Sequence, residues 1–360
     1  MNKTIAIICE YILMPERIGG MDRFFKAFDE VLKEKGYKVT WFFKDAKPFD
    51  FYKNLDVKNA KNSNLENFFI DYCTQNNVQF DIVITHFIPL ANDFFKKIKK
   101  QFNPYCIAVD HNPRPLEGFP FKKRLKNKLK GILYSKYVDK YVGVSEYTKK
   151  HILHDFGNFL HHKTSVIYNG IDVDIYKKQL VSRNKYPLKF MVVSHLRESK
   201  GIQDLLKAIN HIDKKWNNKF SVDIFGDGPY KEELVRMTNE FQLNELINFK
   251  GNSPNLNSLF CNYHYMVQST YMECFSLSIL ESLASNVPVI TTTVGGNPEI
   301  IQNNINGFLF EAKDVMKLKE ILEGILENTL IIDKNVALEV EQNYTLNTMV
   351  NNHLKLVECI

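Results

Sequence analysis

The sequence predicts an α/β protein made of two similar halves, each organised around a parallel sheet. Short apolar runs alternate with amphipathic stretches along the chain, which is typical of the strands and helices of βα units. This alternation occurs twice, and a crossing that contains an Asn-Gly turn dipeptide separates the two series. The length of 360 residues agrees with two domains, because one domain usually takes about 150 residues.

The first half contains five apolar runs of strand length. They are Thr4–Ile8, Lys38–Phe43, Asp81–Thr85, Tyr105–Val109 and Tyr141–Val144. Between the first two lies Met21–Lys35, whose Phe, Val and Leu residues recur at helical spacing. This half therefore predicts a parallel sheet whose strands are joined by helices.

The second half repeats this pattern and ends in one more helix. Its expected strands are Lys189–Val193, Val222–Phe225, Ile247–Phe249, Tyr265–Gln268 and Val289–Thr292. Its expected helices include Ile202–Ile212 and Lys231–Phe241, and Thr345–Cys359 is a final amphipathic stretch.

The domain boundary is placed just after the segment Val166–Asp172, which contains the turn dipeptide Asn169-Gly170. We expect an N-terminal domain of residues 1–170 and a C-terminal domain of residues 171–344. Residues 345–360 then form the separate terminal helix.

The composition is ordinary for a folded protein, with 44% hydrophobic and 24% charged residues. It excludes a disordered tail, a coiled coil and a disulfide mini-protein. The 47 basic and 41 acidic residues leave a net charge of only +6, which does not indicate nucleic-acid binding. The six cysteines form no Cys-x-x-Cys pair, so free thiols in a reducing compartment are expected.

The apolar runs also bear on localisation. The first one stops at Glu10, which is too short for a secretory signal, and no run reaches the roughly 18 residues of a membrane span. We therefore expect a cytoplasmic protein, or one attached peripherally to the inner face of the cell membrane.

The segment Ser269–Glu281 carries the strongest chemical signal. It follows an expected strand and opens a helix at about Ser276, whose first backbone N–H groups suit a phosphate. Glu273 precedes this helix and Glu281 lies within it; about 12 Å of helical rise keeps them from sharing a metal or a proton. They can instead hold the two ends of an elongated ligand such as a nucleotide-sugar. Taken alone, the spacing equally allows a turn cap at Glu273 and a solvated Glu281.

This segment, followed by Val287–Ile290 and Gly295–Glu299, closely resembles the donor-binding core of family-4 glycosyltransferases of the GT-B fold. In that family two glutamates with seven residues between them grip the donor, and Glu273 and Glu281 have this separation. The resemblance implies two Rossmann-like domains whose parallel sheets face an interdomain cleft. It also implies donor contacts from Phe275, Ser276 and Leu277 at the helix start.

Other segments resemble the same family in the same order, from near residue 4 to the last helix. They are Gly19-Gly20, Val144–Thr148, Val166–Asp172, Gly226–Pro229 and Phe249–Gly251. The glycine pair allows backbone amides to approach a phosphate closely, and Lys250 lies in the segment that resembles the loop near the nucleotide base. Each motif is weak alone, but the ordered set is specific.

The segment Ser194–Gly201 resembles the family's phosphate-binding loop and departs from it at one position. Lys200 matches the lysine that meets the diphosphate, where negative charge grows as the sugar leaves. Five residues before it, the family usually has Arg and this chain has His195. Either Arg197 supplies the guanidinium from a shifted position, or His195 donates one hydrogen bond.

His111 follows an expected strand, at the edge where parallel sheets place their ligands. The resemblance puts a histidine of this loop near the reacting sugar, so we predict a catalytic role for it beside Glu273 and Lys200. His86, after the preceding strand, is a weaker candidate, since most single histidines are structural.

The segment Phe121–Lys140 gathers the basic charge. Before Asp139 it contains seven Lys and Arg residues and no acid, and its apolar residues fall on one helical face. Such a helix suits an anionic membrane surface, although an ordinary helix packed on its own domain fits equally well. Stacking aromatics are not interleaved with the basic residues, so a nucleic-acid partner is not expected.

The resemblance implies a retaining hexosyltransferase that moves a sugar from a nucleotide-sugar to a saccharide or lipid-linked acceptor in cell-surface polysaccharide synthesis. The expected donor is a UDP- or GDP-sugar. The resemblance also implies no metal requirement, and no other cofactor is expected. In agreement with this, Asp172-Val173-Asp174 lies in the expected domain crossing and not at a strand end, where an Asp-x-Asp metal motif would lie. A nucleotide-sugar epimerase or hydrolase on the same fold is one alternative, and a catalytically silent partner of a polysaccharide assembly complex is another. A dinucleotide dehydrogenase is disfavoured, since Gly-x-Gly-x-x-Gly does not follow the first strand.

Overall fold

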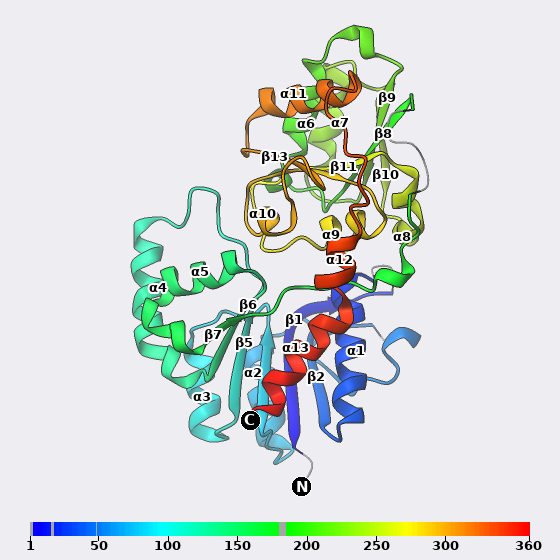
Figure 1. The fold of residues 1–360 in the computed structure, drawn as a ribbon. Helices are drawn as coiled ribbons and strands as arrows, with labels where there is room; N and C mark the ends of the chain where they lie inside the picture. The colour runs from blue at the N-terminus through cyan, green and yellow to red at the C-terminus, as the bar shows by residue number, and fades with distance from the viewer. Residues whose placement is uncertain (1–2, 16–17, 48, 180–184) are drawn as a thin grey trace. The chain divides into compact units, whose positions relative to one another are not determined.

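The computed structural model describes residues 3–15, 18–47, 49–179 and 185–360. The chain forms two compact units, which are coloured by residue number in Figure 1. Unit 1 contains residues 1–170 together with 346–360, and unit 2 contains residues 171–345. The last helix therefore belongs to the same unit as the N-terminal half.

Unit 1 is a seven-stranded parallel sheet in the order β3-β2-β1-β4-β5-β6-β7. Its strands are β1 (Thr4–Leu13), β2 (Lys38–Ala46), β3 (Val57–Asn59), β4 (Ile82–His86), β5 (Tyr105–Asp110), β6 (Lys140–Gly143) and β7 (Thr164–Val166). Its helices are α1 (Gly20–Glu34), α2 (Leu65–Gln75), α3 (Asp93–Gln101), α4 (Phe121–Tyr134), α5 (Glu146–Phe156) and α13 (Leu346–Glu358).

The central strand β1 shows why this sheet forms. Each of its residues from Ile5 to Cys9 is fully buried, as expected for a parallel strand covered on both faces. The strand order reverses between β1 and β4, whose residues pair in register up to Cys9 and His86. Parallel sheets bind ligands beyond the carboxyl ends of their strands at such a reversal. The segments that follow β1 and β4 are therefore the place to look for a site in unit 1.

Unit 2 is a six-stranded parallel sheet in the order β10-β9-β8-β11-β12-β13. Its strands are β8 (Leu188–Val193), β9 (Phe220–Phe225), β10 (Ile247–Gly251), β11 (Tyr265–Gln268), β12 (Val289–Thr292) and β13 (Gly307–Phe310). Its helices are α6 (Ile202–Asn210), α7 (Lys231–Glu240), α8 (Leu256–Leu259), α9 (Leu277–Ala284), α10 (Asn297–Ile300), α11 (Val315–Leu326) and α12 (Leu338–Asn343). Here the order reverses between β8 and β11.

The terminal helix α13 packs on α1, and both are labelled in Figure 1. The His353 ring of α13 is buried 4.8 Å from the ring of Phe24, measured between centroids. The amide of Gly170 donates to the sulfur of Met349 at 3.3 Å, and Lys35 pairs with Glu358 at 3.3 Å. These contacts explain why the C-terminus belongs to unit 1.

The predicted α/β class, the parallel sheets and all ten predicted strands are confirmed. Strand β1 continues five residues past the predicted end at Ile8, and the ends of the other predicted strands differ by at most three residues. Three further strands, β3, β7 and β13, occupy sheet edges and have only three or four residues each. An edge strand has one neighbour and needs no long apolar run, so the pattern did not reveal them.

The predicted basic helix was too long. It ends at Tyr134, a short 3₁₀ turn follows, and Lys140 already begins β6. Among the described residues, no helix has both the length and the apolar character that a bilayer crossing requires.

Candidate active site

Lys200 and Glu273 form an ion pair in unit 2, with Nζ and Oε2 3.0 Å apart. They come from the segments that follow β8 and β11, the two strands between which the sheet order reverses. Lys200 ends a 3₁₀ turn just before α6, where the positive end of the helix dipole disfavours a cation. Glu273 offsets that cost.

The Lys200 turn is fixed against the segment that follows β11. Gly201 has φ +67°, and a Cβ there would lie 1.8 Å from the carbonyl oxygen of Ser269, so only glycine fits. The Ser269 hydroxyl donates to the Gly201 carbonyl at 2.7 Å, and the Tyr271 amide donates to the Ser199 carbonyl at 2.8 Å. The lysine therefore sits on a backbone held at several points.

The Glu273 backbone is held by a second close contact. Gly295 has φ +66°, and a Cβ there would lie 2.0 Å from the carbonyl oxygen of Glu273. The Gly296 amide donates to the Cys274 carbonyl at 2.9 Å, and the Cys274 amide donates to Glu273 Oε1 at 3.1 Å. The glycines of segment Gly295–Glu299 thus bring the β12 loop against the glutamate.

Helix α9 begins one residue after Ser276, as predicted. The Ser276 hydroxyl accepts from the Ile279 amide at 3.4 Å and from the Gln268 side chain at 2.8 Å, which caps the helix and ties it to β11. Phe275 is buried, with its ring 5.3 Å from that of Tyr344, and Leu277 is the first helical residue. Glu281 lies half-buried in the next turn.

The remaining predicted donor residues of unit 2 lie on neighbouring loops. His195 and Arg197 are both exposed on either side of the buried Leu196, whose amide donates to Asp227 of the glycine-rich turn at 3.0 Å. The choice between these two side chains as the substitute for the family arginine stays open. Lys250 lies at the end of the edge strand β10, with Nζ 3.6 Å from Asp223 Oδ1.

In unit 1, His86 and His111 form a hydrogen-bonded pair at the ends of β4 and β5, with His86 Nδ1 and His111 Nε2 3.0 Å apart. The Phe87 ring stacks on His111 at 4.3 Å. Burial lowers the pKa of His111 to about 3, and burial beside His111 and His353 lowers the pKa of His86 well below its usual value. Both rings are therefore neutral at pH 7, and one proton lies between them.

The buried nitrogen of His86 indicates which ring donates. Its Nε2 has no hydrogen-bond partner, and a buried N–H without an acceptor is rarer than a buried lone pair without a donor. We infer that His86 carries its proton on Nδ1 and donates it to His111. The remaining proton of His111 is then on Nδ1, which makes this ring a hydrogen-bond donor toward a ligand.

This inference gives a prediction for His86 as a positioning residue. Replacement His86→Leu removes the donor, so His111 should shift toward its Nε2–H tautomer, which ¹⁵N NMR of the ring nitrogens distinguishes. Replacement His86→Asn keeps an N–H near the position of Nδ1 and should preserve the original tautomer and more of kcat. If His111 keeps its tautomer in the His86→Leu variant, the inferred hydrogen bond from His86 to His111 is refuted.

The loop that carries His111 is clamped by a buried arginine. Arg114 donates from Nε to Asp155 and from Nη2 to Asp110, both at 2.8 Å, and from Nη1 to the Asn112 carbonyl. Arg114, Asp110 and Asp155 are each at most 6% exposed, so the charges compensate one another away from water. Sequence analysis missed this clamp, since a four-residue Asp-to-Arg spacing across a proline was its only local signal.

The predicted glycine pair lies at the start of α1, and its surroundings add a residue that sequence analysis missed. The Gly19 amide donates to the buried carboxylate of Asp22 at 2.8 Å. The same carboxylate accepts from the hydroxyls of Tyr11 and Tyr52. A Cβ at Gly19 would meet Asp22 at an ordinary 3.6 Å, so packing alone does not demand glycine there. Asp22 is the third helical residue, a frequent capping position and the only sequence signal for it.

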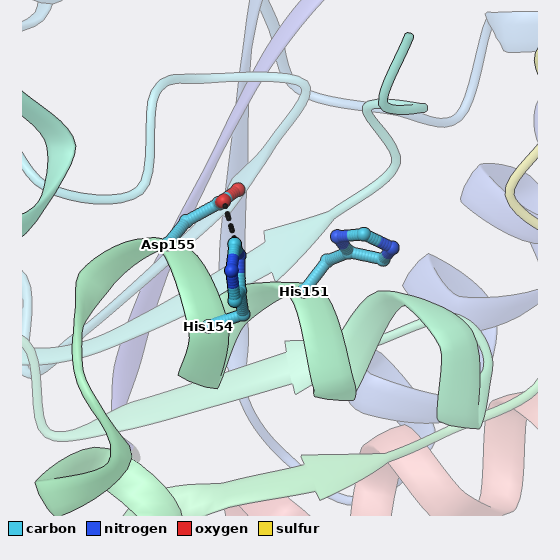
Figure 2. Close-up of side chains that lie close together, drawn as sticks. All are labelled: His151, His154 and Asp155. Carbon is cyan, nitrogen blue, oxygen red and sulfur yellow. Dashed lines mark hydrogen bonds and ion pairs between the residues drawn. The ribbon is translucent and has the colours of Figure 1, made fainter. Parts of the chain in front are cut away.

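Within the described residues, one group of side chains has ligand atoms close enough together for a metal ion: His151, His154 and Asp155 on α5 (Figure 2). His154 Nδ1 lies 3.3 Å from Asp155 Oδ1. The other oxygen of Asp155 already accepts from Arg114, and His154 Nε2 lies 3.2 Å from the Arg124 guanidinium. The positive charges of Arg114 and Arg124 would repel a metal ion at this place. The group is better explained as a set of hydrogen-bonding side chains that supports the Arg114 clamp.

Comparison with known proteins identifies the family. The model of the group 1 glycosyl transferases matches residues 172–342, and that of glycosyltransferase family 4 matches residues 18–175. The chain belongs to the family 4 glycosyltransferases. The two matches fall on unit 2 and unit 1, respectively.

Relatives and solved structures agree with this assignment. The chain is 30% identical over 41% of its length to N-acetyl-alpha-D-glucosaminyl L-malate synthase from Bacillus anthracis, and 22% identical over 82% to poly(glycerol-phosphate) alpha-glucosyltransferase from Bacillus subtilis. These matches span 40% and 44% of the relatives' own lengths. HepE from Anabaena, solved with UDP-glucose, superposes with a TM-score of 0.79 at 16% identity, over 99% of this chain and all of that one. The GT-B fold expected from the sequence is thereby confirmed.

Proposed function

We propose that this family 4 glycosyltransferase transfers a hexosyl group from a nucleotide-sugar to a saccharide or lipid-linked acceptor, with retention of anomeric configuration and without a metal ion. The Lys200–Glu273 pair carries this proposal. Both residues lie at the sheet reversal of unit 2, in the segments that follow β8 and β11, and α9 begins nearby. A cation and a helix N-terminus suit a diphosphate, and a carboxylate suits sugar hydroxyls, which supports the proposal.

Each residue has a distinct role in the proposed reaction. Lys200 and the first amides of α9 stabilise the negative charge that grows on the diphosphate as the sugar C1–O bond breaks. Glu273 accepts hydrogen bonds from sugar hydroxyls, and Glu281 from the ribose. The acceptor oxygen forms the new bond to C1 from the leaving-group face and gives its proton to the departing diphosphate. Neutral His111 donates from Nδ1 to the transferred sugar.

The donor is proposed to be a UDP-sugar before a GDP-sugar, because HepE holds UDP-glucose on the same fold. The names of two relatives, an N-acetyl-alpha-D-glucosaminyl L-malate synthase and a poly(glycerol-phosphate) alpha-glucosyltransferase, pair a sugar with L-malate and with poly(glycerol phosphate). A cell-surface polysaccharide acceptor is the class we propose for this chain.

The donor class and the role of Glu281 are tested together by thermal unfolding with UDP-, GDP-, ADP- and CMP-sugars. A ligand at 100 times its dissociation constant should add about 2.7 kcal/mol to the stability of the native state. We expect one nucleotide to raise the unfolding midpoint of the wild type, and Glu281→Ala to abolish most of that rise because the ribose contact is lost.

Glu320→Ala is the matched control, since Glu320 is an exposed glutamate of the same unit that pairs with the exposed Lys317. It should respond to the donor like the wild type. A midpoint shift that survives in Glu281→Ala would contradict the ribose assignment. Product analysis with and without acceptor separates the alternatives. An epimerase or a hydrolase converts the nucleotide-sugar even when no acceptor is present. A catalytically silent binding partner converts it in neither case.

A further inference from the structure

Helix α4 of unit 1, which is labelled in Figure 1, has large apolar side chains that are exposed to solvent. Five large hydrophobic residues on it are between 50% and 77% exposed: Phe121, Leu125, Leu129, Ile132 and Leu133. At about 100° per residue they fall within an arc of about 120°. We call this arc the α4 face. By comparison, Phe24, Phe25 and Phe28 of α1 are completely buried.

The opposite side of α4 makes the contacts with unit 1. Its partly or fully buried residues are Asn127, Lys130, Gly131 and Tyr134, at the spacing of a single helical stripe. A Cβ at Gly131 would lie 2.0 Å from the carbonyl oxygen of Phe156, so α4 approaches the end of α5 through its smallest residue. The helix is thus packed by polar and small residues while its apolar residues point outward, the reverse of an ordinary surface helix.

The α4 face is bordered by positive charge. Lys126 and Lys128 lie at its two edges and Lys122 within it, and all three are exposed. Among the described residues, none of these three lysines forms an ion pair, and the helix itself contains no acid. Apolar side chains in the centre with cations at the edges match a surface that is negatively charged above an apolar interior.

We propose that the α4 face docks on an anionic lipid bilayer. The five apolar side chains enter the boundary between head groups and acyl chains, while Lys122, Lys126 and Lys128 meet the lipid phosphates. A second copy of this chain is a poor partner for the α4 face. In a symmetric dimer through this face, the lysines of one copy would lie against those of the other, and their like charges would repel. This proposal goes beyond the transfer reaction and does not depend on the identity of the donor.

The test is sedimentation of the full chain with vesicles of pure phosphatidylcholine and with vesicles in which phosphatidylglycerol is added to give a negative surface. The wild type should partition strongly onto the anionic vesicles only. The triple replacement Lys122→Gln, Lys126→Gln and Lys128→Gln should reduce partitioning about a hundredfold, since each near-surface charge contributes about fivefold. The double replacement Leu129→Gln and Ile132→Gln should reduce it at least about tenfold.

Two control variants match these changes on exposed residues elsewhere. Lys53→Gln, Lys100→Gln and Lys150→Gln remove three exposed charges of the same unit, and Met316→Gln with Ile331→Gln removes two exposed apolar side chains of unit 2. Both should partition like the wild type. The proposal would be overturned if the wild type did not bind anionic vesicles, if it bound neutral vesicles equally well, or if the control variants lost as much binding as the α4 variants. It would also be overturned if the wild type bound an acidic protein but not the vesicles. The donor-induced thermal shift should be unchanged in the α4 variants, so failure of docking is distinguishable from failure of the proposed reaction.

Discussion

Replacement of Lys200 by alanine is expected to lower kcat by about 10²- to 10³-fold, the usual effect of removing one donor from a group that stabilises developing negative charge. The diphosphate gains charge as the sugar leaves, so the loss should appear in turnover more than in donor affinity. Steady-state kinetics with a UDP-sugar, together with the donor's dissociation constant, measures the two effects separately.

The ion pair with Glu273 makes this experiment more informative. The two side chains are 24% and 18% exposed, so removal of Lys200 leaves a carboxylate that water reaches only in part. Glu273→Gln and the double variant Lys200→Ala, Glu273→Gln complete a double-mutant cycle. The cycle separates the interaction energy between the two side chains from the contacts that each of them makes with the donor. If the pair is only structural, the kinetic losses should follow the loss of stability.

Lys207→Ala is the matched control, because Lys207 is an exposed lysine on the helix that follows Lys200. Its Nζ lies 3.7 Å from Asp204, whose buried carboxylate also accepts from the Tyr271 hydroxyl. The replacement should leave kcat within about twofold of the wild type, since surface pairs contribute little. A Lys200→Ala enzyme with normal kcat and a raised KM would instead show that the lysine binds donor and transition state equally. That result would reject the assignment to the leaving group.

Replacement of Arg114 by methionine is expected to destabilise unit 1 by about 3–5 kcal/mol, the usual cost of removing one partner from a buried ion pair. Two buried carboxylates, Asp110 and Asp155, would lose their counter-charge, and the loop that carries His111 would lose its clamp. Chemical denaturation of the full chain measures this change in the free energy of unfolding.

The chain offers a specific reporter for that measurement. It has two tryptophans: Trp41, which is buried in unit 1 and donates to Asp29 at 2.8 Å, and Trp216 in unit 2. With Trp216→Phe as the background, tryptophan fluorescence follows unit 1 alone. Lys97→Met is the control, because Lys97 belongs to the same unit and its ion pair with Asp93 is on the surface of α3, where it should contribute nothing measurable.

Adding Asp110→Asn and Asp155→Asn to Arg114→Met removes the two stranded charges and should recover part of the lost stability. If Arg114→Met lowers the free energy of unfolding by less than about 1 kcal/mol, water reaches the two carboxylates and the ion pairs of Arg114 are not buried. Recovery of stability without recovery of turnover would place the role of Arg114 in the geometry of the His111 loop.

The sequence by itself determined the class and layout of the fold. Runs such as Ile5–Ile8 are apolar at every position because a parallel strand is covered on both faces, and that pattern needs no knowledge of neighbours. Ser276 marked the start of α9 for a similarly local reason, since a hydroxyl at that position caps the first turn. The ordered motifs around Glu273 and Glu281 then pointed to the family.

Only the tertiary structure decided which side chains meet. Lys200 and Glu273 are 73 positions apart and pair because β8 and β11 are neighbours in the sheet. His86 meets His111 across two adjacent strand ends, and Arg114 reaches Asp155 on another helix. The apolar residues of α4 gave the same periodic pattern that a buried helix gives, because periodicity shows that a face exists and not which way it points. Its direction was decided by Gly131 and its neighbours, which pack against α5 and leave the α4 face outside.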